Sequence, residues 1–492
     1  MTINHPDIRR LTWILLLCCS AGLLASSVYR AATFPFTCDE SLSYAIFSWA
    51  PKWRTSANNH LLNTFMMHRC MHWFGKSELS LRLPNLLAHL GYLACSMLLL
   101  KRFRSTVLLA AGFVMLNLNP FMLDFFFLAR GYGLALAFMM ASLYLLTRAH
   151  EEKPQKDFPK FLHLSVLAGA LAVLANFSFL NYFLPLLLAG AWLLLSDATL
   201  RRFSRGHIPG AAALFAASGI FLAFIFAQLF RLQRAGEFCF GGKTGFITDT
   251  AGSLVRCSLY STAIPPTTEK TIAAIWAGVF VLVLLLGLHL FLLKKKSPLF
   301  VMYVLVMAVA VALPILQHRL CNALFPIERA ALCYLPLGAL VLLSALDWLA
   351  SHPVRRWEKT AILMFPAALA VILGWHFARS FTTQSCYSWG YDGHLDKVLE
   401  IIDQDRKQHF PSRTIVLGNS WKMEPSMNFY RVTRKYTWLA PVTRDPVNGT
   451  GYDYIYAFEK EAQALLARPH RILASYSDTK TVLLRLDSAA HP

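Results

Sequence analysis

The sequence predicts a polytopic α-helical membrane protein with a small extracytoplasmic α/β domain at its C-terminal end. The 492-residue chain is 56% hydrophobic and only 15% charged, whereas a soluble globular protein is about 25% charged. Many apolar stretches approach the roughly 20 residues that a helix needs to cross a bilayer. The net charge of +20 lies largely in the segments between these stretches, which is typical of membrane topology signals. We therefore expect a membrane lipid environment and no nucleic-acid partner.

About eleven spans follow from the apolar stretches, and the bounds of the shorter ones can move by several residues. They lie near residues 11–30, 83–100, 105–123, 131–147, 161–176, 179–196, 208–230, 272–293, 299–317, 330–349 and 359–377. The first stretch follows a basic N-terminal segment and resembles a signal peptide. Because no small-residue cleavage site follows it, we interpret it as a retained anchor.

The basic connecting segments all fall on the side of the N-terminus. They are residues 101–104, 148–160, 201–205, 294–296 and 355–356. Lys and Arg mark cytoplasmic loops, so the N-terminus is predicted to be cytoplasmic, and an odd number of spans places the C-terminus outside. We expect a plasma-membrane protein with its C-terminal domain on the extracytoplasmic side.

Two outer loops join the spans of the transmembrane domain, residues 1–377. Residues 31–82 contain two amphipathic helical patterns, one around Leu42 and Ile46 and one around Phe65 and Trp73. Such helices lie along the membrane surface. Residues 231–271 form a loop rich in Gly and Thr. Its Cys239 and Cys257 can pair, although spacing alone cannot establish a disulfide.

Residues 378–492 are predicted to form a small soluble α/β domain. Strand-like runs occupy 414–417, 454–457 and 481–486, and helical patterns lie near 392–404 and 458–467. The sequence leaves the task of this domain open between acceptor binding and stabilisation of the fold.

Asp39 and Glu40 are adjacent carboxylates a few residues beyond the first span, on the predicted outer face. Three more polar groups recur at the outer ends of spans: Asn58-Asn59-His60, Asp124 with Arg130 and Tyr132, and His318-Arg319 with Glu328-Arg329. Ionisable groups near membrane depth are costly unless they face a cavity or a partner. For Asp124 and Arg130 we favour a functional site over a structural ion pair. For Glu328-Arg329 a span-end ion pair is an equal alternative.

His60, His68 and His72 are spaced to share one helix face. Two His residues four positions apart can hold a metal ion. No third ligand is apparent, however, so the polar face of an interfacial helix explains this pattern better.

An inverting sugar transfer needs a carboxylate that takes the acceptor's proton and cations that stabilise the departing phosphate. Asp39 or Glu40 can take the first role. Arg130 with Arg329 or Lys243 can take the second, because a guanidinium offers a planar fork of donors. No P-loop, nucleophile elbow, zinc-protease or dinucleotide-binding motif is present.

These residues resemble the GT-C class of integral-membrane glycosyltransferases, near the protein O-mannosyltransferase and aminoarabinose transferase branch and its bacterial members with a Dol-P-Man-transferase-like domain. The resemblance covers about residues 1–350. It rests on Asp39-Glu40, on Asn58-Asn59-His60, on Asp124 with Ala129-Arg130-Gly131-Tyr132, and more loosely on Pro326 to Arg329. Many relatives have His-Pro-Pro where this chain has His60-Leu61-Leu62, which puts the role of His60 in doubt.

The resemblance implies a hexosyl- or pentosyltransferase that uses a polyprenyl-phosphate sugar and an extracytoplasmic lipid, glycan or protein acceptor. Asp39 would be the catalytic base, and Glu40 and Asp124 would orient the acceptor or hold a divalent metal (Mg, Mn or Zn). Arg130 would bind the donor phosphate, with Arg329 and Lys243 as further candidates. Asn59, His60 and Tyr132 would contact substrate.

A transferase of this kind requires Asp39, Asp124 and Arg130 to converge on one outer-facing cavity. A transporter or flippase of a lipid-linked or polar substrate would instead have ionisable residues along a midplane path, and the centres of most spans lack charge. A non-catalytic assembly protein of the same fold stays open. The sugar, the acceptor and the oligomeric state are not determined by the sequence.

Overall fold

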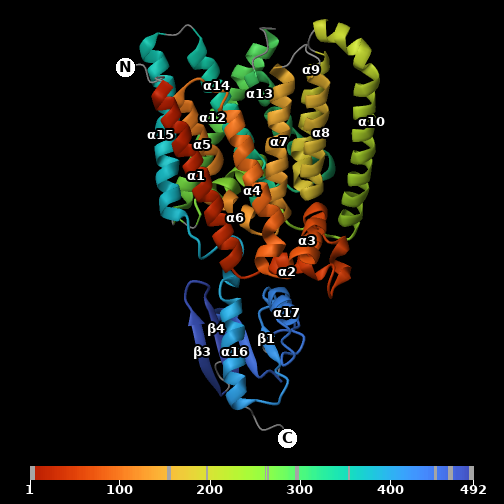
Figure 1. The fold of residues 1–492 in the computed structure, drawn as a ribbon, viewed down its shortest axis with the longest axis vertical. Helices are drawn as coiled ribbons and strands as arrows, with labels where there is room; N and C mark the ends of the chain where they lie inside the picture. Colours follow the sequence, from red (N-terminus) through yellow and green to blue (C-terminus); the bar gives the residue numbers. More distant parts are fainter. Residues whose placement is uncertain are drawn as a thin grey trace.

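The computed structural model confirms a bundle of apolar helices with a small domain at one end (Figure 1). It describes residues 6–151, 157–195, 198–260, 262, 265–293, 299–352, 355–447, 451–463 and 469–486. Within these ranges ten helices are long and apolar enough to cross a membrane, or eleven if one bent pair counts as a span. The protein is therefore a polytopic membrane protein, as predicted.

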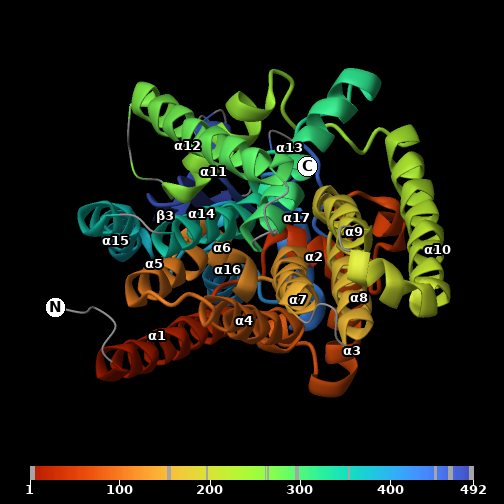
Figure 2. The same cartoon turned by 90° about the horizontal axis from the view of Figure 1, so that it is seen from above.

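Ten helices coincide with predicted apolar stretches. They are α1 (Pro6–Thr33), α4 (Glu78–Leu100), α7 (Gly131–Glu151), α8 (Phe158–Ala175), α9 (Leu180–Leu195), α10 (Ala198–Arg234), α12 (Pro266–Leu292), α13 (Leu299–Cys321), α14 (Tyr334–Ser351) and α15 (Arg356–Ser380), with η2 (Phe177–Phe179) before α9. Seen from above (Figure 2), α10, α12 and α15 lie at the rim. These three leave most of their surface exposed, whereas α14 is buried along most of its length.

The predicted span at residues 105–123 is instead a broken one. It consists of α5 (Thr106–Asn117) and α6 (Pro120–Phe127), which are bent by 60° at the break. The Asn119 side chain accepts a hydrogen bond from a backbone N–H of α6, and Pro120 takes the first helical position. Both features start a new helix, so the apolar stretch cannot form one straight span.

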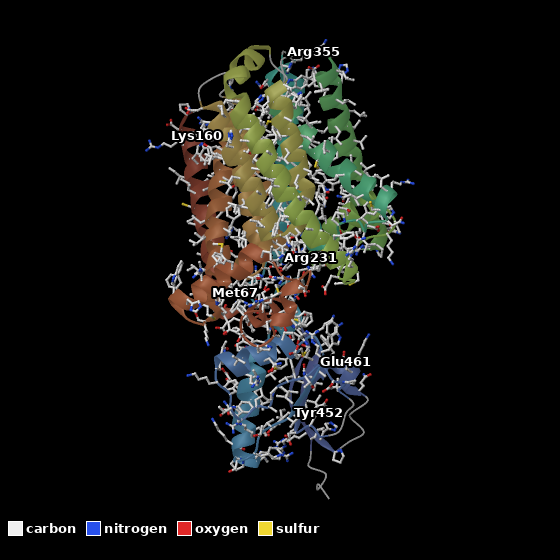
Figure 3. All side chains as sticks on the ribbon, turned by 90° about the vertical axis from the view of Figure 1, so that its right-hand side faces the viewer. Met67, Lys160, Arg231, Arg355, Tyr452 and Glu461 are labelled. Carbon is white, nitrogen blue, oxygen red and sulfur yellow. The ribbon has the colours of Figure 1, made fainter. Side chains whose placement is uncertain are left out.

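The connections separate onto two ends of the bundle (Figure 3). Lys160 and Arg355 lie at the end far from the C-terminal domain, whereas Met67 and Arg231 lie at the end beside it. The N-terminal helix α1 begins at the far end (Figure 1). The described part of the chain thus begins at one end of the bundle with α1 and finishes in the C-terminal domain at the other (Figure 1), which agrees with an odd number of crossings. The basic residues at 294–296 and part of the 148–160 segment lie outside the described residues, and the side chains at 201–205 are not described either.

Three short elements of the first outer loop lie across the lower end of the bundle (Figure 1): α2 (Cys38–Ala45), η1 (Pro51–Thr55) and α3 (Leu61–Phe74). The α3 helix exposes Phe65 and Trp73, as expected of a helix on a membrane surface. For α2 this expectation is wrong. Tyr44 and Ile46 are buried, because α2 packs between the bundle and the C-terminal domain.

The second outer loop contains η3 (Phe246–Ala251) and α11 (Gly252–Ser258). Its Gly242 pairs in an isolated antiparallel bridge with Phe325, which precedes η4 (Glu328–Ala331). The bridge brings this loop beside the start of α14. Cys239 is exposed and Cys257 is buried, and both are free thiols, so the disulfide that the spacing allowed is absent.

The C-terminal domain is a four-stranded sheet in the order β1-β2-β4-β3 with helices around it. β1 and β2 are parallel, and the other neighbours are antiparallel. The elements are η5 (Gly390–Asp392), α16 (Leu395–His409), β1 (Leu417–Asn419), α17 (Glu424–Thr433), β2 (Tyr454–Phe458), α18 (Glu459–Ala462), β3 (His470–Tyr476) and β4 (Thr481–Leu486). The prediction missed β3, a partly exposed edge strand that begins at His470.

This domain shares a hydrophobic core with the first outer loop. Tyr454 and Tyr456 of β2 face a cluster that includes Phe36 and Tyr44, whereas the alternate residues of β2 face a second cluster on the other side of the sheet. Alternation of side chains along a strand produces these two faces. The C-terminal domain is therefore packed directly against α2 and not merely tethered to it.

Candidate active site at the outer end of the bundle

Asp39 lies in the first turn of α2 and faces two arginines. Its Oδ1 accepts a hydrogen bond from Asn58 Nδ2 at 3.2 Å. Its Oδ2 lies 3.5 Å from Arg130 Nη2 and 3.9 Å from Arg329 Nη2. The Asp39 side chain is 15% exposed, so this carboxylate is paired with cations and still within reach of solvent. Solvent access allows this carboxylate to meet an incoming hydroxyl, as a general base must.

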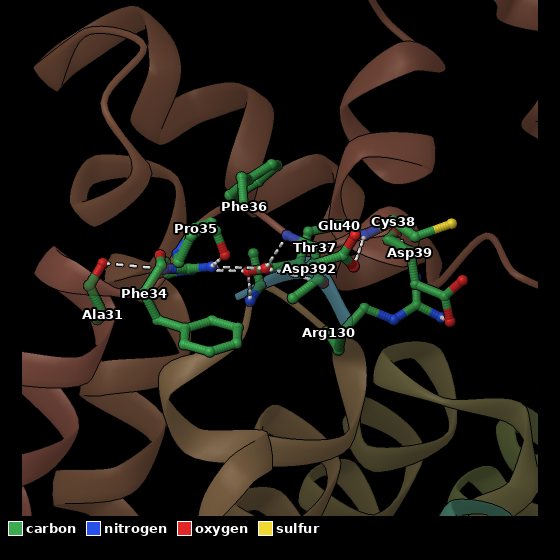
Figure 4. A network of polar contacts seen from close by, with 12 residues as sticks. Ala31, Phe34, Pro35, Phe36, Thr37, Cys38, Asp39, Glu40, Arg130 and Asp392 are labelled. Carbon is green, nitrogen blue, oxygen red and sulfur yellow. Dashed lines mark hydrogen bonds and ion pairs between the residues drawn. The ribbon is translucent and has the colours of Figure 1, made fainter. Parts of the chain in front are cut away.

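Arg130 precedes α7 and is fully buried beside Asp39 (Figure 4). Nη1 donates to the Asp39 carbonyl oxygen and to Ser43 Oγ, each at 3.0 Å. Nη2 donates to Asn58 Oδ1 and, at 2.8 Å, to His60 Nε2. The terminal nitrogens of this guanidinium are thus occupied by the protein. Arg130 ties the first outer loop to the start of α7.

His60 is held in the neutral form by its surroundings. Burial lowers the pKa of His60 well below its usual value, and the charges of Arg130 and Arg329 lower it further. Because a guanidinium can only donate, His60 Nε2 must accept from Arg130, and the ring proton sits on Nδ1. Gly131 permits this packing, since a Cβ there would lie 1.9 Å from the Ala175 carbonyl oxygen and 2.8 Å from His60 Cβ.

Arg329 is the more accessible of the two arginines, with 26% of its side chain exposed. Its guanidinium carbon lies 5.4 Å from the Phe240 ring centroid and 5.3 Å from that of Trp389. Tyr132 interacts with Arg329, and the Tyr132 ring lies 5.0 Å from that of His60. Arg329 is therefore fixed between aromatic rings beside Asp39, where a planar cation can bind an anion.

Glu40 is adjacent to Asp39 in sequence, but its role in the structure is different. It is fully buried and forms a two-contact ion pair with Arg82, in which Nε lies 2.8 Å from Oε1 and Nη2 lies 2.7 Å from Oε2. The Thr37 N–H and hydroxyl also donate to Oε2, and the Ala129 N–H donates to Oε1. Five donors therefore surround its two oxygens, so the Glu40 carboxylate is fully hydrogen-bonded by the protein. Figure 4 shows Glu40 beside Thr37 in this polar network.

Asp124 is also surrounded by protein donors. Arg30 Nη2 donates to its Oδ1 at 2.6 Å, the Tyr260 hydroxyl lies 2.9 Å from Oδ2, and the Tyr387 N–H donates to Oδ2 at 2.8 Å. No described contact joins Asp124 to Asp39 or to Arg130. The structure thus brings Asp39 and Arg130 together and leaves Asp124 as a buried link between α1, α6 and the chain after α15. The expectation that all three residues converge on one cavity is therefore wrong for Asp124, and the case for a transferase keeps Asp39 and Arg130.

The partners of these two acids, Arg30 and Arg82, were not singled out by sequence reasoning. Both are fully or almost fully buried at the ends of the spans α1 and α4 that lie beside the C-terminal domain (Figure 1). The sequence did contain a sign of them, because an arginine inside an otherwise apolar stretch needs a buried partner for its charge.

Lys243 and Asn59 lie near the site without a described contact to Asp39. Lys243 is exposed and follows the Gly242 that pairs with Phe325, four residues before Arg329. Asn59 is used locally, since Oδ1 accepts from the Thr64 hydroxyl and Nδ2 donates to the Arg54 carbonyl oxygen, both at 2.9 Å.

The arrangement does not fit the divalent metal that the resemblance allowed. Within the described ranges, no group of three or more His, Cys, Asp or Glu side chains could hold an ion. Glu40 and Asp124 are occupied by separate arginines, and the side chains that pair with Asp39 are the cations Arg130 and Arg329. Two guanidinium groups this close to Asp39 oppose the binding of a metal cation there.

No protein-family model and no curated protein matches the chain. Several solved structures, however, are similar to it in fold. ArnT from Cupriavidus metallidurans in the apo state has 13% identity and a TM-score of 0.53, over 96% of this chain and 97% of that chain. The same protein bound to undecaprenyl phosphate has 13% identity and a TM-score of 0.53, over 97% and 99%. The archaeal oligosaccharyltransferase AglB from Archaeoglobus fulgidus has 10% identity and a TM-score of 0.44, over 97% and 75%.

The likeness to ArnT shows the fold. The chain has the GT-C architecture along nearly its whole length, so the shared fold extends beyond residues 1–350 into the C-terminal domain.

Proposed function

We propose that this protein is an inverting glycosyltransferase that moves a sugar from a polyprenyl-phosphate donor to an acceptor on the outer side of the membrane. The single observation that carries the proposal is Asp39, a partly exposed carboxylate between Arg130 and Arg329. The fold supports it, because ArnT, whose architecture the chain shares, has been solved bound to undecaprenyl phosphate.

In this reaction Asp39 takes the proton from the acceptor hydroxyl. The acceptor oxygen then attacks the anomeric carbon from the side opposite the phosphate. The bond between that carbon and the phosphate oxygen breaks, and the polyprenyl phosphate leaves with the electron pair. Attack from the opposite side inverts the configuration at the anomeric carbon, and no covalent sugar–enzyme intermediate forms.

Arg329 binds the leaving phosphate in this proposal, and Arg130 positions Asp39. The division follows from hydrogen bonding, since the terminal nitrogens of buried Arg130 are occupied by Asp39, Ser43, Asn58 and His60. Arg329 is partly exposed and can donate to a phosphate as its charge develops. Lys243, exposed on the loop that the Gly242 bridge holds nearby, adds a second cation.

The proposed location is the inner membrane of a bacterium, with the site and the C-terminal domain in the periplasm. The distribution of Lys and Arg among the connecting segments supports this orientation.

The test begins with a comparison of membranes that contain or lack the protein, in which mass spectrometry identifies the glycan or lipid that changes. Transfer to that acceptor is then measured with the purified protein in detergent. Asp39→Asn is expected to lower the transfer rate by about 10²- to 10⁴-fold and to leave the thermal unfolding temperature nearly unchanged.

Glu40→Gln is the matched control, because it makes the same chemical change one residue away. It breaks the buried pair with Arg82, and such a loss costs about 3–5 kcal/mol, so it should lower the unfolding temperature. Full transfer activity in Asp39→Asn would show that Asp39 is not the base.

A further inference from the structure

An aromatic and basic surface borders the Asp39 site where the first outer loop meets the C-terminal domain. We call it the Trp53–Trp421 patch. Its members come from η1, from η5 and from two loops of the C-terminal domain, and they are Trp53, Tyr391, Trp421, Lys422 and Arg444.

In the patch, each cation lies between two aromatic rings. The Arg444 guanidinium carbon lies 5.2 Å from the Trp53 ring centroid and 5.9 Å from that of Trp421. Lys422 Nζ lies 5.8 Å from the Trp421 centroid and 5.7 Å from that of Tyr391. Arg444 thus links two tryptophans that are separated by more than 300 residues of sequence. A cation above the face of an aromatic ring is attracted to that ring, so these contacts hold the patch together.

The patch lies beside the N-terminus of α2, next to Asp39. Burial raises the pKa of the Cys38 thiol, as do the Asp39 and Asp392 carboxylates, while nearby Arg444 and the Tyr391 hydroxyl act in the opposite direction. Arg444 and Tyr391 therefore both lie close to the residue that precedes Asp39. The Cys38 N–H also donates to Asp392 Oδ2 at 2.8 Å, which fixes η5 and Tyr391 beside α2.

The patch has unused binding capacity. Trp421 is 55% exposed. Arg444 is paired with Glu424, at 2.9 Å from Nε to Oε2, but in the part of the chain that the structure describes no carboxylate pairs with Lys422. The exposed ring of Trp421 and the ammonium of Lys422 are therefore available to a ligand.

We propose that the Trp53–Trp421 patch binds the acceptor, and that this acceptor is a saccharide bearing phosphate or carboxylate groups. The apolar face of a sugar ring can pack on an exposed indole, and an anionic substituent gains charge-assisted hydrogen bonds from Lys422 and Arg444. A hydroxyl of such a saccharide would then reach Asp39. This inference rests on the proposed transfer reaction, and it names the chemical class of the acceptor.

Saturation-transfer NMR on the full-length protein in detergent tests the binding step, with glucose 6-phosphate as the probe and glucose as its uncharged counterpart. Glucose 6-phosphate should receive saturation, and glucose several-fold less. Trp421→Ala and Lys422→Gln should each reduce the glucose 6-phosphate signal several-fold. Trp73→Ala, which removes an exposed tryptophan of α3, should leave it unchanged. Equal signals for the two sugars, or undiminished signals in both patch variants, would overturn the proposal.

The same anionic chemistry is found in lipid headgroups, so a second arm uses nanodiscs. The glucose 6-phosphate signal should be the same in discs of phosphatidylcholine alone and in discs that contain phosphatidylglycerol. A signal abolished by phosphatidylglycerol would assign the patch to lipid headgroups and contradict a saccharide acceptor.

Binding needs no turnover, so this test is separate from that of the proposed function. Asp39→Asn, which cannot take the acceptor's proton, should still bind glucose 6-phosphate, and Trp421→Ala in that background should still reduce the signal. Transfer activity without binding at the patch would refute this inference alone, whereas binding without any transfer activity would refute the proposed function.

Discussion

At the residue scale, Asp39 and Glu40 are neighbours with different environments. Consecutive residues of an α-helix point about 100° apart, so the Glu40 carboxylate faces Arg82 in the interior, whereas the Asp39 carboxylate faces buried Arg130 and the partly exposed Arg329. The sequence offered either carboxylate as the base, and the resemblance favoured Asp39. Only the surrounding structure shows that the oxygens of Glu40 are fully hydrogen-bonded, whereas Asp39 is accessible to solvent.

His60 provides a prediction on pH dependence. Its folded-state pKa is depressed by burial, Arg130 and Arg329, whereas an unfolded His titrates near 6.5. The contribution of neutral His60 to the free energy of unfolding is therefore complete above about pH 6.5. It is lost as the pH falls from there towards the folded-state pKa, with a slope of at most ~1.4 kcal/mol per pH unit for one proton. His60→Gln keeps an acceptor for Arg130 and does not titrate, so its stability should fall less steeply.

The measurement is the thermal unfolding temperature in detergent at a series of pH values from 7.5 to 5. His352→Gln, which replaces an exposed His at the end of α14, should follow the unmodified protein. If His60→Gln and the unmodified protein lose stability in parallel, then His60 is not neutral in the folded state.

At the element scale, α2 is held from two sides. Arg82 and Arg130 hold it from the bundle. From the C-terminal domain, the Tyr430 hydroxyl accepts the Phe36 N–H at 2.8 Å, and Phe429 stacks on Phe36 with ring centroids 4.2 Å apart. The orientation of Asp39 thus depends on a domain that lies more than 350 residues away in sequence.

Tyr430→Phe should loosen this helix without removing its hydrophobic contacts. The variant leaves the buried Phe36 N–H without its acceptor, which costs about 1–3 kcal/mol. We expect kcat for sugar transfer to fall several-fold while KM for the donor stays nearly constant, since Arg329 is untouched.

Tyr476→Phe makes the same change on the edge strand β3 and should retain kcat. Steady-state kinetics of the purified variants measure both quantities. An equal kcat in Tyr430→Phe and Tyr476→Phe would show that the C-terminal domain does not position Asp39.

The broken pair α5 and α6 shows what hydropathy alone misses. Residues 105–123 are apolar enough for one span, but Asn119-Pro120 starts a second helix in the middle. The capping signal was present in the sequence. Hydropathy outweighed it in the prediction because apolarity is counted over a whole window, whereas a cap acts at one residue.

At the scale of the whole molecule, the basic segments predict the orientation in the membrane. Lys160 and Arg355 lie at the end opposite the C-terminal domain (Figure 3), and positively charged ends stay in the cytoplasm. Alkaline phosphatase fused to the C-terminus should therefore be active in a bacterial host, since it folds in the periplasm. A fusion at residue 355 should be inactive.

A green fluorescent protein fused at the same two positions should give the reverse pattern, because it becomes fluorescent in the cytoplasm. Phosphatase activity at residue 355 combined with fluorescence at the C-terminus would contradict the predicted orientation.

The sequence by itself determined the membrane class and ten of the spans, and it predicted that the two termini lie on opposite sides and that Asp39 and Arg130 belong to one site. Hydropathy and charge act along the chain over short windows, so the sequence displays them directly. The tertiary structure decided that Glu40 pairs with Arg82 and that Asp124 pairs with Arg30. It also decided that Arg329 lies beside Asp39 and that the C-terminal domain packs on α2. These outcomes depend on which side chains meet across distant segments, and no local pattern records such pairings.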